Sequence, residues 1–283
     1  MTDKFKNLLV RTASGAVFVA LVVGSFFVPT IFQYLLFLFF AEVGTWEYCR
    51  ICNKNDLQLH TPMCLCITWL VVTFGFFEWA LETFWIVIIL GMMLLPIIEL
   101  FRKSEKPFTN IAHNLLPIFW IALPFALAGI LVQLESMDSM VLSIFILIWA
   151  SDTFAYCGGS LFGKHKMFER ISPKKTWEGI IVGTILTCGL AVLLSYIPYF
   201  YNAISDTVEP HSAKDIMIWV AFALVVVVFG TLGDLIESMF KRSYHIKDSG
   251  NIMPGHGGVL DRFDSFLFAM PACVLFLILT WLI

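Results

Sequence analysis

Long apolar runs alternate with short charged segments along the chain. Several runs approach or exceed the length of about 20 residues that a helix needs to cross the hydrocarbon core of a bilayer. The run 139–163 is interrupted only by Asp152. The charge-free runs are 12–41, 57–77, 83–98, 107–134, 179–205, 216–233 and 265–283. This pattern predicts membrane-spanning helices that are separated by polar turns.

The first apolar run is too long for a single span and contains Pro29. Proline lacks an amide hydrogen and interrupts a helix, so we expect a hairpin of two helices here, the second continuing to about Tyr48. This division gives about nine spans and predicts an all-α, polytopic integral membrane protein. We expect residues 1–135 to form a scaffold of about five helices. Residues 136–283 would carry the chemistry, on loops 158–176 and 238–264.

Composition and charge placement support this interpretation. The chain has 283 residues, 59% of them hydrophobic, and a mean hydropathy of +0.85, which is too apolar for a water-soluble domain of this length. Loops rich in lysine and arginine remain on the cytoplasmic side of a membrane. With the N-terminus in the cytoplasm and nine spans, every lysine and arginine except Lys214 lies on that side. The C-terminus is therefore predicted to lie outside.

The basic cytoplasmic loops suit anionic lipid headgroups and nucleotide phosphates. Their cations are scattered over several loops between spans, which argues against a nucleic-acid partner. The most polar segment, 238–264, lies between two apolar runs and combines cations, carboxylates and glycines. Cations hold phosphates, carboxylates hold hard metal ions, and glycines allow a close backbone approach. This combination indicates metal-assisted phosphoryl or nucleotidyl transfer at a membrane surface.

Acidic and basic side chains follow the apolar run 216–233 at helical spacing. If the helix continues, one face carries Asp234, Glu237, Ser238, Lys241 and Arg242. The acids on this face suit a metal ion and the cations suit the phosphates that it bridges. The alternative for Asp234 is an ion pair with Lys241 or with another neighbour.

Two upstream features have both a functional and a structural explanation. Asp152 lies near the cytoplasmic end of its predicted span. There it either faces the same cavity as the acids of the segment 238–264 or pairs with a lysine from another helix. Lys174 and Lys175 follow a glycine-containing loop. They either contact a phosphate or extend along the interface with their charged ends in water.

The segment 238–264 resembles the signature of the phosphatidate cytidylyltransferase, or CDP-diacylglycerol synthase, family. The resemblance is carried by Ser238, Lys241-Arg242, Lys247-Asp248, Gly255-His-Gly-Gly258 and Asp261-Arg-Phe-Asp264. Weaker similarity lies in Ser151-Asp-Thr-Phe-Ala-Tyr156 and Ser172-Pro-Lys-Lys-Thr-Trp-Glu-Gly179. The resemblance implies transfer of the cytidylyl group of CTP to phosphatidic acid, giving CDP-diacylglycerol and pyrophosphate. It also implies a bacterial inner membrane with the active site facing the cytoplasm.

The resemblance further implies roles for individual residues. The expected catalytic residues are Asp234, Asp261, Lys247 and His256. The expected substrate-binding residues are Lys174, Lys175, Ser238, Lys241, Arg242, Arg262, Gly257 and Gly258. Asp234 and Asp261 are the expected metal ligands, with Asp152, Asp248 and Asp264 as further candidates. The implied cofactor is Mg²⁺, for which Mn²⁺ would substitute, together with a second, monovalent cation, and a homodimer is expected.

Two other functions use similar residues. A transporter or ion channel also places acids within its membrane helices, but it predicts polar groups near the middle of the bilayer and often repeated halves. A CTP-dependent lipid kinase would move the γ-phosphoryl group instead.

The N-terminal region shows no clustered polar chemistry in its sequence. We expect Glu42 and Glu47 to be solvated at the membrane interface, with a headgroup contact as the alternative. His113 has no evident partner and is expected to be a satisfied buried or interfacial histidine.

Overall fold

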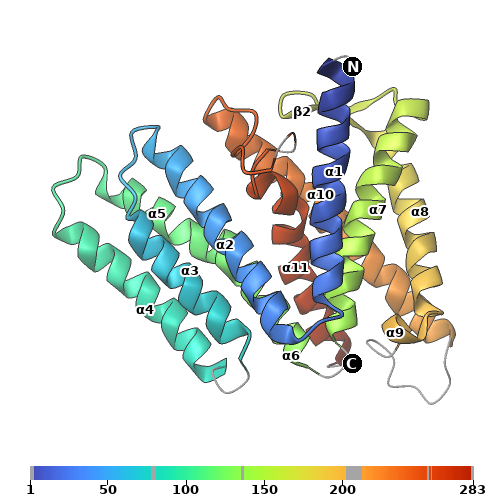
Figure 1. Ribbon diagram of the computed structural model, residues 1–283, viewed down its shortest axis with the longest axis horizontal. Helices are drawn as coiled ribbons and strands as arrows, with labels where there is room; N and C mark the ends of the chain where they lie inside the picture. Colours follow the sequence, from blue (N-terminus) through green and yellow to red (C-terminus); the bar gives the residue numbers. More distant parts are fainter. Residues whose placement is uncertain are drawn as a thin grey trace. The chain divides into compact units, whose positions relative to one another are not determined.

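The structure is a computed structural model that describes residues 3–77, 81–134, 137–201, 212–253, 255 and 257–281 (Figure 1). The chain forms two compact units. The first comprises residues 1–133 and 243–263, and the second comprises residues 134–242 and 264–283. The polar segment 243–263, which the sequence groups with the C-terminal region, therefore packs with the N-terminal helices. The functional division into a scaffold and a catalytic region stays a prediction.

The first unit is a bundle of helices. Its elements are α1 (Asp3–Ser25), α2 (Thr30–Asn53), α3 (Thr61–Gly75), α4 (Leu81–Leu100), α5 (Pro107–Pro117), the π-helical turn η2 (Ile118–Ala122) and α6 (Leu123–Gln133). The helices α2, α3 and α4 lie side by side in chain order (Figure 1). Pro117 and Pro124 flank η2, where their missing amide hydrogens interrupt the regular hydrogen-bond ladder.

Aromatic side chains form the core of the first unit and anchor the segment 243–263 within it. Phe37 lies between Phe76 and Phe125, with ring centroids 5.9 Å from each. Phe263 lies 4.7 Å from Phe40 and 5.1 Å from Phe125. Such close ring pairs stabilise a core beyond the area that they bury. The start of α11 is thereby fixed against α2 and α6.

The second unit contains the other long helices and a small β-hairpin. Its elements are α7 (Asp138–Phe162), β1 (Lys166–Phe168), β2 (Ser172–Thr176), α8 (Trp177–Ser195), α9 (Pro198–Tyr201), α10 (Ala213–Ser243) and α11 (Leu260–Trp281). The last residue of α10 and the first turn of α11 belong to the first unit. The strands are antiparallel, with Lys166 opposite Thr176 and Phe168 opposite Ser172. This hairpin was not expected in an all-α fold.

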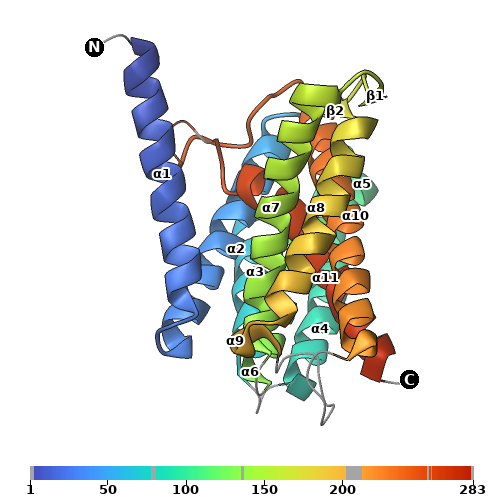
Figure 2. The ribbon, with the colours of Figure 1, turned by 90° about the vertical axis from the view of Figure 1, so that its right-hand side faces the viewer.

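Glycines bring α7 and α8 into close contact, and the two helices lie side by side in Figure 2. A Cβ atom at Gly158 would collide with Val182, and one at Gly179 would collide with the carbonyl oxygen of Ala155. Small residues allow membrane helices to approach in this way. The close approach places the β-hairpin at the joined ends of α7 and α8.

The helical, multi-spanning architecture predicted from the sequence is confirmed. Among the described residues, six helical segments are long and apolar enough to cross a membrane, and Val10–Ser25 and Thr61–Gly75 are shorter apolar helices. The predicted break at Pro29 is confirmed because α1 ends at Ser25 and α2 begins at Thr30. The count of nine spans and the sidedness of the termini stay predictions.

Candidate active site

The acidic and basic stripe predicted after residue 233 lies on one continuous helix. Helix α10 extends to Ser243, so that its last three turns carry Asp234, Glu237, Ser238 and Lys241. Ser238 Oγ donates a hydrogen bond of 3.2 Å to Asp234 Oδ1. Lys241 forms an ion pair with Glu237, whose side chain is fully buried. The stripe is therefore a network of charges and not a row of separately solvated side chains.

Asp234 takes its counter-ion from the β-hairpin. Lys175 Nζ on β2 lies 2.6 Å from Asp234 Oδ2. The predicted alternative of an ion pair at Asp234 is thus observed in this structure, with Lys175 in place of Lys241. Lys174, the preceding residue, is exposed, as is Arg242 on α10. The β-hairpin thus pairs Lys175 with Asp234 and leaves Lys174 exposed to solvent.

The β-hairpin is held in place by Glu178 at the start of α8. Its carboxylate accepts hydrogen bonds from the backbone amides of Lys164 and His165, at 3.1 and 3.2 Å, and lies 2.5 Å from His165 Nδ1. Thr176 caps α8 by accepting a hydrogen bond from Gly179 N at 3.2 Å. These contacts fix the two ends of the segment that carries Lys174 and Lys175.

Three carboxylates from three helices of the second unit interact electrostatically. Asp264 on α11 is within electrostatic range of Asp234 on α10 and Asp152 on α7, and Lys241 also acts on it. Ser265 N donates a hydrogen bond of 2.6 Å to Asp264 Oδ1. Like charges at this range repel unless a cation compensates them. The positive charge of Lys241 offsets part of this repulsion.

Asp261 lies in a different setting, in the part of α11 that belongs to the first unit. Its Oδ2 accepts hydrogen bonds from Ser249 N at 2.8 Å, Ser249 Oγ at 2.9 Å and Gly258 N at 2.8 Å. It thereby ties together the two ends of the loop 249–258. Within that loop, Met253 N donates to Gly257 O at 3.0 Å.

Other predicted residues of this segment have simpler surroundings. Gly257 has a φ of +84°, a conformation that glycine adopts without strain, and Gly258 is buried. The side chains of Lys247, Asp248 and Arg262 are exposed. His256 lies outside the described residues. The structure thus groups Asp152, Lys175, Asp234, Ser238, Lys241 and Asp264 in the second unit, and Lys247, Asp248, Gly257, Gly258, Asp261 and Arg262 in the first.

Comparison with known proteins gives consistent matches. The profile of the cytidylyltransferase family matches residues 9–280. The phosphatidate cytidylyltransferase of Bacillus subtilis (strain 168) is 31% identical over 283 residues, covering 96% of each chain. The protein of the same name from Rickettsia typhi is 39% identical over 163 residues, covering 58% of this chain and 69% of that one. The protein of the same name from Staphylococcus aureus (strain COL) is 45% identical over 138 residues, covering 49% of this chain and 48% of that one.

The chain belongs to the cytidylyltransferase family. The resemblance seen in the segment 238–264 is therefore confirmed. Because the family profile covers both units, the N-terminal helices belong to the same enzyme as the charged segment. The chain is a nucleotidyltransferase embedded in a membrane.

The expectation that Glu47 is solvated at the membrane interface is wrong. Glu47 is fully buried, and its Oε2 accepts hydrogen bonds from Ser249 Oγ and Leu260 N, both at 3.0 Å. It is not solvated at an interface. The sequence did contain a signal, because Glu42 and Glu47 are the only charges between Thr12 and Tyr48. What was missing was the partner, which lies more than two hundred residues away along the chain.

Two further polar groups in the first unit, the half-buried His113 and the buried Glu99, have partners that the sequence did not indicate. His113 Nδ1 lies 2.7 Å from the hydroxyl of Tyr48. Glu99 accepts hydrogen bonds from Asn110 Nδ2 at 2.8 Å and from Ser104 Oγ at 2.5 Å. Both clusters satisfy polar atoms inside an apolar bundle, as burial requires.

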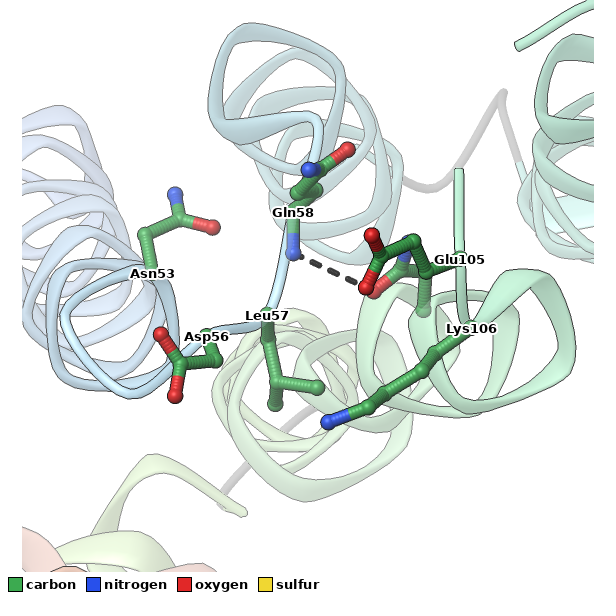
Figure 3. Close-up of a pocket in the computed structure, with 7 residues that line it drawn as sticks. Asn53, Asp56, Leu57, Gln58, Glu105 and Lys106 are labelled. Carbon is green, nitrogen blue, oxygen red and sulfur yellow. Dashed lines mark hydrogen bonds between the residues drawn. The ribbon is translucent and has the colours of Figure 1, made fainter. Parts of the chain in front are cut away.

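A polar pocket of about 460 Å³ lies beside the Glu99 cluster (Figure 3). Two of its lining residues are joined by a hydrogen bond of 3.1 Å from Gln58 N to Asn110 Oδ1. The pocket is lined by Asn53, Asp56, Leu57, Gln58, Glu105, Lys106 and Asn110. None of the predicted site residues lines this pocket.

Proposed function

We propose that this chain transfers the cytidylyl group of CTP to phosphatidic acid and releases pyrophosphate, giving CDP-diacylglycerol for phospholipid biosynthesis. The family match over residues 9–280 is the observation that carries this proposal. The paired acid and base on α10 and β2 supply suitable chemistry. The Bacillus subtilis relative, matched over 96% of both chains, bears the name of this activity.

The main obstacle to this reaction is electrostatic. A phosphate oxygen of the lipid must attack the α-phosphorus of CTP while pyrophosphate leaves, so two anions must approach each other. The attacking phosphate already carries negative charge near neutral pH, and no strong general base is required. Catalysis must come chiefly from alignment and charge neutralisation. We assign these roles to Lys175, Lys241 and Arg242 in the second unit, with Lys174 as an exposed contact.

We also propose substrate contacts for residues of the first unit. We assign phosphate contacts to Lys247, Arg262 and the backbone of Gly257 and Gly258. His256 is proposed to donate a hydrogen bond or a proton.

The carboxylates fit a hard divalent cation. We propose that Mg²⁺, replaceable by Mn²⁺, is held by Asp234 and Asp261, with Asp152, Asp248 and Asp264 as further ligands. In the described part of the chain, no group of three or more His, Cys, Asp and Glu side chains is compact enough to hold a metal. Mg²⁺ usually takes only one or two protein carboxylates and completes its shell with water and substrate phosphates, so a compact group of three is not required. The ion would neutralise phosphate charge, and a monovalent cation is proposed beside it.

We further propose nine spans, with the N-terminus and the active site in the cytoplasm and the C-terminus outside. The membrane would be a bacterial inner membrane. The placement of nearly all lysines and arginines in alternate loops supports this orientation. A homodimer is proposed as well. Reporter fusions after each predicted span, and the mass of the detergent-solubilised protein, would test these two points.

Transfer can be tested with purified protein, CTP labelled at the α-phosphate, dioleoyl phosphatidic acid and Mg²⁺. Label in the lipid together with pyrophosphate release is the expected result. Label left in CDP would instead identify a lipid kinase, and no turnover would favour transport. Omission of phosphatidic acid is the control for hydrolysis of CTP.

A further inference from the structure

Glu47 occupies a position in the first unit that neither the signature nor the family match assigns to any role. It lies in the last third of α2 and has no exposed surface. A carboxylate is costly to bury unless donors satisfy it. Its Oε2 is satisfied by two donors from the opposite end of the chain, the Ser249 hydroxyl and the Leu260 amide.

These two donors lie at the beginning and just after the end of the loop 249–258. Ser249 opens the loop, and Leu260 is the first residue of α11. Glu47 therefore acts as a cap for α11 that is supplied by a different helix. The first amides of a helix have no partner within the helix, and an acceptor placed on them stabilises that end.

The loop closes around the Glu47 carboxylate. A Cβ atom at Gly250 would collide with Glu47 Oε1, and one at Gly258 would collide with both carboxylate oxygens. Glycine at these two positions lets the loop backbone lie directly against the side chain. The carboxylate thus fits between the start and the end of the loop, and a bulkier residue at either glycine would displace it.

Glu47 and Asp261 share a single hydroxyl. Ser249 Oγ lies 3.0 Å from Glu47 Oε2 and 2.9 Å from Asp261 Oδ2. The carboxylate of Asp261 also binds the amides of Ser249 and Gly258. One proton thus serves two acceptors, so that the position of Asp261 depends on that of Glu47.

We propose that Glu47 is a positioning residue, which fixes the loop 249–258 and the Asp261 carboxylate in the arrangement required for nucleotide binding. It acts through Ser249 and Leu260 and does not itself touch the substrate. The kinetic part of this inference rests on the proposed function. The structural part, that Glu47 orders the loop, stands independently of it.

The structural part is tested by hydrogen–deuterium exchange on the detergent-solubilised full chain. In Glu47→Ala, peptides covering 247–262 should exchange about tenfold faster or more, because a charge-assisted acceptor is lost from the loop. Peptides from α3 should exchange as in the unaltered protein. Glu42→Ala is the matched control, since Glu42 lies on the same helix and takes no part in the hydrogen bonds that join Glu47 and Asp261 to the loop.

The kinetic part is tested by steady-state assays of the same variants. We expect Glu47→Ala to raise KM for CTP about tenfold, and Glu47→Gln to restore at least half of the lost kcat/KM, because the amide oxygen still accepts from Leu260 N. A purely structural role would reduce the amount of folded enzyme. That loss would lower the apparent kcat and leave KM unchanged.

Ser249→Ala removes the shared hydroxyl without truncating α2, and it should also accelerate exchange in the loop. If Glu47→Ala is poorly folded, Ser249→Ala provides the comparison, with Glu47→Gln as the variant that keeps the acceptor for Leu260 N. Loop exchange within twofold of the unaltered protein in Glu47→Ala or, in its absence, in Ser249→Ala would overturn the proposal. Equal acceleration in Glu42→Ala would do the same. If the unaltered protein makes no CDP-diacylglycerol, the proposed function fails and the exchange result still decides the role of Glu47.

Discussion

Asp234 and Asp261 have the same predicted role but different surroundings. Asp234 in the second unit is compensated by a cation, the ammonium of Lys175 at 2.6 Å. Asp261 in the first unit is compensated by three hydrogen-bond donors from its own loop. A lysine can move to an incoming phosphate, whereas backbone amides are fixed by the fold. The first acid is therefore arranged for exchange of its partner, and the second for holding a loop in place.

The largest expected effect is at Asp234, where a substitution should remove activity but leave the stability of the fold nearly unchanged. Asp234→Asn should lower cytidylyl transfer at least about a hundredfold, because it removes a charge needed to hold the cation. The ion pair with Lys175 is partly solvent-exposed, with 22% and 27% of the side chains accessible, and contributes about 0–1 kcal/mol at most. The midpoint of thermal unfolding should therefore change little. Transfer within tenfold of the unaltered enzyme would remove Asp234 from the site.

A substitution at Asp261 should lower activity and stability together. Asp261→Asn should lower transfer by a similar factor and also destabilise the folded protein by about 1.5–3 kcal/mol, since three donors lose a charged acceptor in a buried place. Thermal unfolding of the two variants, measured side by side in the same detergent, gives the comparison. Equal midpoints for Asp234→Asn and Asp261→Asn would contradict the structural difference between the two regions.

Close packing of the loop provides an intermediate test. Gly258→Ala should destabilise the protein by about 1–3 kcal/mol and impair transfer, because its Cβ would collide with Ser249 and Glu47. Gly189→Ala on α8 is the matched control, since no atom of the described residues beyond its own helical turn lies within 4 Å of the place that the added methyl group would take. It should be neutral or slightly stabilising, because alanine favours a helix over glycine.

Variants of the adjacent Lys174 and Lys175 test which lysine of the second unit contacts the phosphates of CTP. Lys175→Ala should raise KM for CTP about tenfold, because this lysine is already held beside the acid network. Lys174→Ala should raise it less, since its exposed side chain is less well ordered. Initial rates over a range of CTP concentrations give both values. A larger effect at Lys174 would assign the phosphate contact to the exposed lysine.

The smallest effect is expected at Tyr199 on α9, which follows the end of α8 that lies away from the β-hairpin. Tyr199 OH donates a hydrogen bond of 2.9 Å to Asp138 Oδ2. Tyr199→Phe should cost about 0.5–1.5 kcal/mol of stability and leave KM for CTP and kcat within twofold. Thermal unfolding and the transfer assay measure the two effects. A large kinetic change here would show that any lost polar contact impairs the enzyme, and the comparison of the two acids would lose its meaning.

Several features of the fold followed directly from the sequence. The apolar runs located the helices, and Pro29 located the turn between α1 and α2. The helical spacing of Asp234, Ser238 and Lys241 placed them on one continuous helix, α10. The β-hairpin 166–176 escaped prediction because its strands have three and five residues and no alternation of apolar and polar positions.

The residue pattern thus established a helical membrane enzyme of the cytidylyltransferase family and indicated which charged segment carries its signature. It did so because bilayer thickness and helical periodicity act on neighbouring residues, which a sequence displays directly. The partners of those charges came from the three-dimensional packing. Lys175 reaches Asp234 across 59 positions, and Glu47 reaches Leu260 across 213. A hydrogen bond or an ion pair depends on distance in space, and sequence separation carries no information about that distance until the helices have packed.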